Sequence, residues 1–186
     1  MIRIAFYGSS LVSSYWNGAA TYYRGLLRNL AGLGYDITFY EPDAYERQAH
    51  RDMDAPSWAR SVVYPASDDG LRRVIAEAAA ADVVVKASGV GIYDDELLKG
   101  VMRAARSDAV KLFWDVDAPA TLAAMREDAM HPVRRALRRL DLVMTYGGGP
   151  PVVAAYGEMG ARRCVPVYNG LAPTTHFPVP SERRFA

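Results

Sequence analysis

Short apolar runs alternate with longer amphipathic segments along the chain. The apolar runs cover residues 2–7, 37–40, 61–64, 83–85, 110–114, 142–144 and 164–167. Between them, residues 19–33, 71–81 and 94–106, two stretches around Pro132 and one ending near Gly160 have helical periodicity. Asp68, Asp69 and Gly70 open the helix at 71–81 and place acids in its first turn. The polar stretch 45–54 is consistent with a short helix or a loop. Strands that are apolar without alternation are typical of a parallel sheet covered on both faces.

The pattern predicts an α/β fold: a Rossmann-like, doubly wound, mainly parallel sheet of about six or seven strands flanked by helices. Residues 1–172 form one domain in this interpretation. Residues 173–186 contain three prolines and no periodicity, and we expect them to be a linker.

Composition excludes several classes of protein. The net charge of +1 gives no electrostatic argument for nucleic acid. An arginine cluster at 134–139 is interpreted as a solvated helix face, and nothing else favours membrane contact. The single cysteine, Cys164, rules out an intrachain disulfide framework and is expected to be a small buried hydrophobe. Residues 2–7 look like a strand and not a signal peptide, so we expect a cytoplasmic protein.

Ligands of open parallel sheets bind beyond the carboxyl ends of the strands. The segments that follow the predicted strands are polar or rich in glycine, and we expect them to line one cleft. Gly8, Ser9 and Ser10 present either N–H groups and hydroxyls to a ligand or a turn with capping serines. Gly147, Gly148 and Gly149 exceed what a turn needs, which favours close approach of a ligand to the backbone. The other predicted cleft residues are Asn17, Gly18, Ser88, Gly89, Tyr146 and Asn169.

Asp115 and Asp117 follow the fifth strand, and their spacing places only one of them toward the cleft if the strand continues. A carboxylate there suits a general base or a hydrogen-bond acceptor for sugar hydroxyls. The alternative is that one of them caps the following helix. The three histidines lack metal-ligand spacing, so no metal site is predicted. Trp16 and Trp58 would mark an interface if they were exposed, but we expect them to be buried in the cleft or core.

Several stretches resemble the N-terminal domain of GT-B glycosyltransferases, and most closely the CgeB-like (spore maturation protein) group. They are residues 2–8 (IRIAFYG), 21–30 (TYYRGLLRNL), 34–41 (GYDITFYE) and the aspartate–proline segment 113–119 (FWDVDAP). Residues 141–146, 156–161 and 165–173, with His176 and Phe177, follow the order of strands and helices in that group.

The resemblance implies the acceptor-side half of an enzyme that transfers a sugar from a nucleotide-sugar donor to a hydroxyl. Donor contacts would lie mostly in a C-terminal domain, and this half would be inactive alone, with no cofactor of its own. A cleft-lining role for residues 8–10, Asp115, Asp117 and 146–149 carries over. Asp117 or Asp115 is the predicted base. The donor, the acceptor and the stereochemical outcome are not specified by these residues.

An NAD(P)-binding oxidoreductase domain is the alternative. Glu41 ends the second strand, where an acid would bind a ribose hydroxyl. However, the dinucleotide fingerprint needs Gly-x-Gly-x-x-Gly directly after the first strand, and here no glycine follows Gly8 until Gly18. A receiver-like or scaffold module is a third possibility. This sequence lacks the acidic pair that would follow the first strand of such a module.

Overall fold

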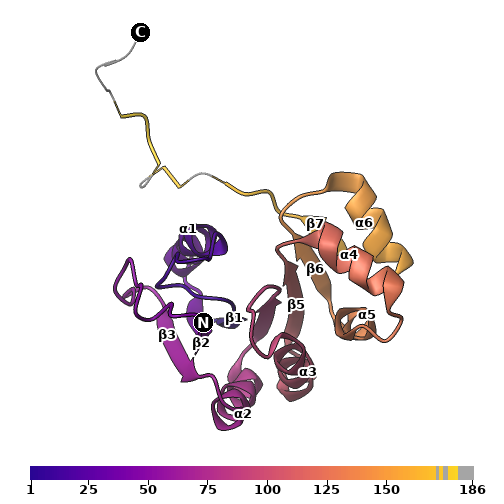
Figure 1. Cartoon of the computed structure of the whole chain (residues 1–186), viewed down its shortest axis with the longest axis horizontal. Helices are drawn as coiled ribbons and strands as arrows, with labels where there is room; N and C mark the ends of the chain where they lie inside the picture. Colours follow the sequence, from indigo (N-terminus) through magenta and orange to yellow (C-terminus); the bar gives the residue numbers. More distant parts are fainter. Residues whose placement is uncertain (171, 174–175, 180–186) are drawn as a thin grey trace.

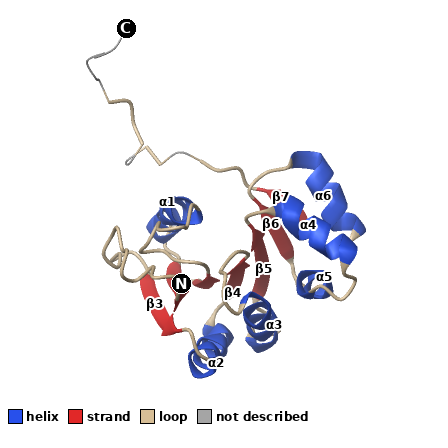
Figure 2. Ribbon diagram, viewed as in Figure 1, coloured by secondary structure: helices blue, strands red, loops and turns tan. Residues whose placement is uncertain are grey.

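The computed structural model describes residues 1–170, 172–173 and 176–179. Within them, seven parallel strands form one sheet flanked by six α-helices (Figures 1 and 2). The strands are β1 (Arg3–Tyr7), β2 (Asp36–Asp43), β3 (Arg60–Pro65), β4 (Val83–Ala87), β5 (Val110–Asp115), β6 (Leu142–Thr145) and β7 (Cys164–Pro166). The helices are α1 (Ala19–Gly32), α2 (Asp68–Glu77), α3 (Asp94–Ala104), α4 (Ala118–Glu127), α5 (Pro132–Ala136) and α6 (Gly149–Glu158). The predicted Rossmann-like α/β class is confirmed.

The strand order is β3-β2-β1-β4-β5-β6-β7, so the direction of winding reverses between β1 and β4. Phe6 of β1 is level with Phe39 of β2 on one side and with Val85 of β4 on the other. In this topology the loops after β1 and β4 diverge to opposite faces of the sheet and leave a crevice between them.

Two apolar clusters cover the two faces of the sheet. Helices α2 to α6 pack on one face, where Tyr7 is fully buried and donates its hydroxyl to the Val74 carbonyl at 2.8 Å. Helix α1 packs on the other face through Tyr23 and Leu27. There Phe6 stacks on Phe39 with 5.2 Å between ring centroids. Figure 2 shows α1 alone on its side of the sheet.

The helix predicted at 71–81, with residues 68–70 at its opening, is α2, and it begins at Asp68. The Ser67 hydroxyl accepts the Gly70 N–H at 3.2 Å and caps this helix, which gives way to a 3-10 turn at Ala78–Ala80. Of the two alternatives for residues 45–54, a short helix or a loop, the structure has turns at residues 45–50.

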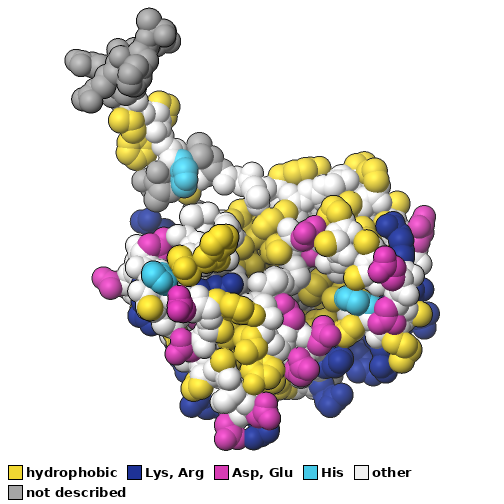
Figure 3. Space-filling model, viewed as in Figure 1, with side chains coloured by type: hydrophobic (Ala, Val, Ile, Leu, Met, Phe, Trp, Pro, Cys, Tyr) yellow, Lys and Arg dark blue, Asp and Glu magenta, His cyan; other side chains and the backbone are white. Residues whose placement is uncertain are grey.

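The prediction for Trp16 was wrong, because its side chain is 85% exposed, while Trp58 packs half-buried against the α1 cluster. The predicted linker at 173–186 falls largely outside the described residues. None of the described helices has the length and apolar character needed to span a bilayer. Charged side chains of both signs are spread over the face drawn in Figure 3.

Candidate functional site

The carboxyl ends of all seven strands lie at one edge of the sheet, because every strand pair is parallel. The segments predicted to form the cleft follow one another along this edge in the order of the strands. Residues 8–18 come after β1, residues 88–93 after β4, 116–117 after β5, 146–148 after β6 and 167–170 after β7. What differs between these segments is whether their polar groups are already hydrogen-bonded within the protein.

The loop after β1 uses its polar side chains to hold its own shape. Ser9, Ser10 and Asn17 are buried. The Ser9 hydroxyl donates to Asn17 Oδ1 at 2.7 Å, and Asn17 Nδ2 donates to the carbonyls of Ser10 and Ser13, both at 3.0 Å. A Cβ at Gly8 would lie 2.6 Å from the Phe39 ring, so this glycine is explained by packing. Gly18 precedes α1 without a side-chain cap.

Glu41, in β2, binds the same loop through its buried carboxylate. Its side chain is fully buried, and its Oε2 accepts the Leu11 N–H at 2.5 Å while Oε1 accepts Gln48 Nε2 at 2.7 Å. Both carboxylate oxygens are therefore occupied by the protein. An acid that binds a ribose needs these oxygens free.

Arg47 lies at the crevice between β1 and β4. It is 6% exposed, and its Nη1 donates to the carbonyls of Ser9 at 3.2 Å and Val90 at 3.3 Å. The Tyr45 ring covers the guanidinium, with 5.0 Å from Cζ to the ring centroid. Burial lowers the pKa of Arg47, and nearby Glu41 partly opposes that shift. This arginine joins the loops after β1, β2 and β4, and sequence reasoning missed it because its partners are carbonyls far apart in the chain.

Asp115 is the centre of a buried hydrogen-bond network. It is fully buried, and its Oδ1 accepts the hydroxyls of Ser88 at 3.0 Å and Thr121 at 2.9 Å together with the Asp117 N–H at 3.1 Å. The Tyr156 hydroxyl donates to Oδ2. Asp115 thus anchors the ends of β4 and β5 to α4 and α6, and its oxygens are turned away from solvent.

Asp117 lies two residues further on and is exposed. Its Oδ1 accepts the Ala120 N–H at 3.3 Å and caps α4, which is the alternative considered from the sequence. No hydrogen bond involves its second oxygen among the described residues. Asp117 therefore combines a capping role with a carboxylate oxygen that faces solvent at the rim.

The glycines after β6 form the turn into α6. Gly148 and Gly149 have left-handed φ values of 87° and 54°, and a Cβ at Gly148 would lie 2.2 Å from Val152 Cγ2. The turn itself thus accounts for Gly148. Tyr146 packs toward the α1 face, 4.9 Å from the Tyr22 ring, while Asn169 is exposed beyond β7. Strand β5 separates the glycine turn after β6 from the loop after β4, whereas Tyr146 contacts the helix that follows the β1 loop.

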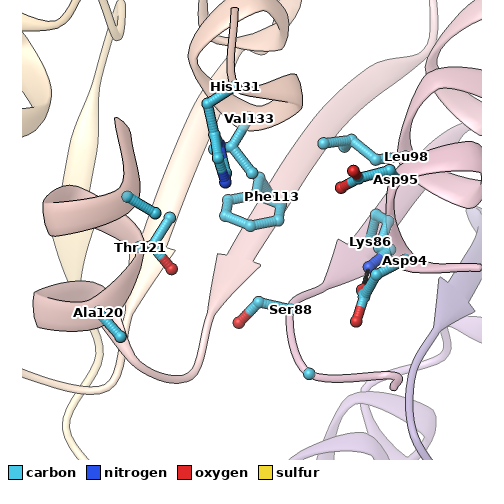
Figure 4. A pocket seen from close by; sticks show the side chains of 12 residues that line it. Lys86, Ser88, Asp94, Asp95, Leu98, Phe113, Ala120, Thr121, His131 and Val133 are labelled. Carbon is cyan, nitrogen blue, oxygen red and sulfur yellow. Dashed lines mark hydrogen bonds and ion pairs between the residues drawn. The ribbon is translucent and has the colours of Figure 1, made fainter. Parts of the chain in front are cut away.

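A cavity of about 280 Å³ opens between α3, the carboxyl ends of β4 and β5, and the α4–α5 segment (Figure 4). Of the predicted residues, Ser88 and Gly89 line it. The other polar lining groups are Lys86, Asp94, Asp95, Thr121 and His131, and the apolar wall includes Phe113, Leu98 and Val133. Figure 4 shows Phe113 in the middle of the lining, with His131 and Val133 beside it and Leu98 on the side of α3.

Lys86 is 1% exposed at the end of β4 and pairs with Asp94 of α3, while its ammonium also donates to the Ala87 carbonyl at 2.7 Å. Burial lowers the pKa of Lys86, and the Asp94 carboxylate opposes that shift. Sequence reasoning missed this pair, although one signal was present: Lys86 interrupts an otherwise apolar strand.

His131 precedes α5 and lines the opposite side of the cavity. Its Nδ1 is buried and has no hydrogen-bond partner within the described part of the chain. The sequence could not indicate that this nitrogen lacks a partner, because burial and hydrogen bonding of a side chain depend on tertiary packing. No group of three or more potential metal-ligating side chains occurs among the described residues.

No protein-family model matches the sequence, and no curated relative is found. Solved structures do share the fold. An α-glucosyltransferase in complex with UDP-glucose and DNA has a TM-score of 0.56 at 12% identity, over 89% of this chain and 42% of that one. Arabidopsis thaliana UGT89C1 complexed with UDP has a TM-score of 0.56 at 10% identity, over 89% and 51%. A Serratia marcescens short-chain dehydrogenase/reductase has a TM-score of 0.50 at 10% identity, over 91% and 97%.

At these identities the likeness extends to the Rossmann-like fold alone. These three solved structures include glycosyltransferases and a dehydrogenase/reductase that share the fold, so the function of this chain has to be argued from its site. This chain spans about half the length of the two glycosyltransferases.

Proposed function

We propose that this chain is the acceptor-side domain of a GT-B glycosyltransferase that transfers a sugar from a nucleotide-sugar donor to a hydroxyl. The observation on which the proposal rests is an exposed carboxylate, Asp117, at the start of a helix whose Ala120 and Thr121 line a polar cavity. A carboxylate with one fixed and one free oxygen is oriented and still able to accept a proton.

In the proposed reaction Asp117 accepts the proton of the acceptor hydroxyl through its free oxygen. The acceptor oxygen then forms a bond to the anomeric carbon as the bond between that carbon and the nucleotide diphosphate breaks. The diphosphate leaves with the bonding electron pair and needs positive groups or N–H donors around it. Asp115 would position the loop after β5, because its own oxygens are buried and occupied.

The geometry around β1 disfavours the oxidoreductase alternative. Dinucleotide binding requires free N–H groups in a glycine-rich turn after β1 and an acid free to bind a ribose. Here residues 8–18 separate β1 from α1, the buried polar side chains of this loop are bonded to one another, and both oxygens of Glu41 are used.

The domain arrangement of the enzyme is also part of the proposal. We infer that residues 1–172 form the acceptor-side domain, that 173–186 lead toward a C-terminal domain that binds the donor, and that the enzyme belongs to the CgeB-like group. The coverage of 42% and 51% of the two glycosyltransferases supports a second domain of similar size.

The test compares this chain with the product of the complete reading frame that encodes it. We expect the frame to continue into a second α/β domain and its product to release nucleotide from a nucleotide sugar when a hydroxyl acceptor is present. Asp117→Asn should lower kcat by about 100-fold, since removing a general base costs about 10²–10⁴-fold, while the folded state is retained.

Glu127→Gln is the matched control, because Glu127 ends the same helix, α4, away from the cavity. Its kcat should equal that of the unmodified enzyme. A frame without a second domain, or full turnover by the Asp117→Asn enzyme, would refute the proposal.

A further inference from the structure

We propose that the cavity between α3, β5 and the α4–α5 segment binds one uncharged monosaccharide ring, with His131 as a hydrogen-bonding partner of its hydroxyls. One part of this inference rests on the proposed function, namely that the bound sugar is the acceptor of the transfer reaction. The binding itself depends on the cavity and can be measured without any transfer reaction.

The size of the cavity limits what can enter. At about 280 Å³ it lies just below the roughly 300–1,000 Å³ of pockets that take drug-sized ligands. A single sugar ring is the size of ligand that suits such a space, whereas a complete nucleotide sugar is too large for it.

The charge of the lining favours a neutral ligand. The ammonium of Lys86 is already paired with Asp94, so these two groups cancel. Asp95, also in the lining, makes no ion pair among the described residues and leaves the cavity with net negative charge. An anionic phosphate or diphosphate would be repelled, while hydroxyl groups can donate to the carboxylates.

The remaining lining matches the two-sided character of a sugar ring. Phe113, Leu98 and Val133 offer an apolar wall against which the C–H face of a ring can pack. Opposite the carboxylates, the His131 ring lines the cavity, and its buried Nδ1 has no hydrogen-bond partner among the described residues. A buried polar atom without a partner is costly, and a ligand hydroxyl would remove that cost.

Ser88 and Thr121 add acceptor capacity without further donors. Both hydroxyl protons are directed to Asp115. Ser88 Oγ also accepts the Val116 N–H at 2.9 Å, so Ser88 keeps one lone pair for a ligand hydroxyl, and Thr121 Oγ1 can accept as well. The cavity therefore contains mostly acceptors, with His131 as a group that can donate or accept according to its tautomer. This arrangement fits a polyol, which supplies many O–H donors.

Ala124 of α4 lines the cavity, whereas the adjacent Ala123 is exposed on the same helix. We therefore compare Ala124→Leu, which fills the cavity, with Ala123→Leu as the matched control. Saturation-transfer NMR and titration calorimetry with a panel of neutral monosaccharides, and with UDP as the anionic probe, report binding to the purified chain. At least one sugar should bind the unmodified chain and the control, and Ala124→Leu should weaken binding by tenfold or more.

The role of His131 is tested separately by imidazole ¹⁵N NMR. The Nδ1 resonance of His131 should shift when the sugar is added, and that of the exposed His50 should not. His131→Phe should weaken binding about five- to tenfold, as expected for one lost hydrogen bond, while His131→Asn, which keeps a polar atom near the Nδ1 position, should retain more affinity. Urea unfolding of each variant separates loss of binding from loss of fold.

Three outcomes would overturn the inference: no sugar of the panel binds, UDP competes with the sugar, or Ala124→Leu binds as well as Ala123→Leu. Sugar binding that Ala124→Leu abolishes would support the cavity assignment even if the complete enzyme showed no transfer, so the two proposals fail independently.

Discussion

Substituting Asp115 by asparagine should destabilise the protein far more than the same change at Asp117. Asp115 is fully buried and accepts four hydrogen bonds, three of them on Oδ1. Asparagine keeps a neutral acceptor on one side but presents an NH₂ group where Oδ2 accepts the Tyr156 hydroxyl. A neutral amide oxygen also holds three donors less strongly than a carboxylate does.

The magnitude follows from the bonds that weaken. Hydrogen bonds to charged groups contribute about 1.5–3 kcal/mol each, and a buried donor left without a partner costs about 1–3 kcal/mol. Burying a neutral side chain costs less than burying a charge, which recovers part of this loss. We therefore expect Asp115→Asn to lower the free energy of unfolding by about 2–3 kcal/mol. Asp117→Asn should change it by less than about 0.5 kcal/mol, because asparagine and aspartate are comparable N-caps.

Urea unfolding followed by tryptophan fluorescence measures both values, and buried Trp114 directly precedes Asp115. With a slope of about 2 kcal/mol per molar urea, the midpoint for Asp115→Asn should fall by about 1 M. Equal midpoints for the two variants would refute the anchoring role of Asp115. Asp117→Asn should thus have the smaller effect on stability, yet in the complete enzyme it is the variant expected to lower kcat by removing the proposed base.

Three further predictions concern separate parts of the molecule. Gly148→Ala should lower the free energy of unfolding by more than 1 kcal/mol relative to Gly147→Ala, because it adds a contact with Val152 at a left-handed φ; urea midpoints measure the difference. Burial raises the pKa of the Cys164 thiol from 9.0 to about 11, so at pH 8 a disulfide reagent should modify it about 100-fold more slowly than in urea. The raised pKa also makes the free energy of unfolding depend on pH: its contribution is complete below pH 9 and is lost as the pH rises through 11. Equal modification rates for the folded and the urea-unfolded protein would refute the raised pKa. NAD⁺ and NADP⁺ should leave the melting temperature unchanged, since Glu41 is occupied; a shift that Glu41→Gln removes would contradict this.

The fold was predictable because the periodicity of the sequence is local. Each strand is a short apolar run, and each helix shows its buried face within a few turns. The pattern was less informative where hydrogen bonds between residues decide an element's limits. It left residues 45–54 as a short helix or a loop, and residues 45–50 form turns that place Arg47 against the loops after β1 and β4.

The site was only partly predictable, because sequence position fixes where a polar residue lies and not whether its hydrogen-bonding capacity is free. Asp115 and Asp117 are both at the end of β5, yet one is enclosed by four donors and the other faces solvent. Lys86 and His131, on opposite sides of the cavity, are 45 positions apart in the chain. Their proximity arises from tertiary packing of α3 and α5, which no local pattern encodes.

Ligand specificity can change most readily where polar side chains are not already hydrogen-bonded within the protein. The loop after β1 is bonded internally through Ser9, Ser10 and Asn17, so altering its side chains would disturb its shape before it changed a ligand contact. The proposed sugar cavity is different, because His131 has no partner among the described residues and Asp95 makes no ion pair there. Substitutions at these two positions remove no hydrogen bond that holds a loop in place. Changes in acceptor preference should therefore arise more readily at α3 and the α4–α5 segment than at the glycine–serine loop.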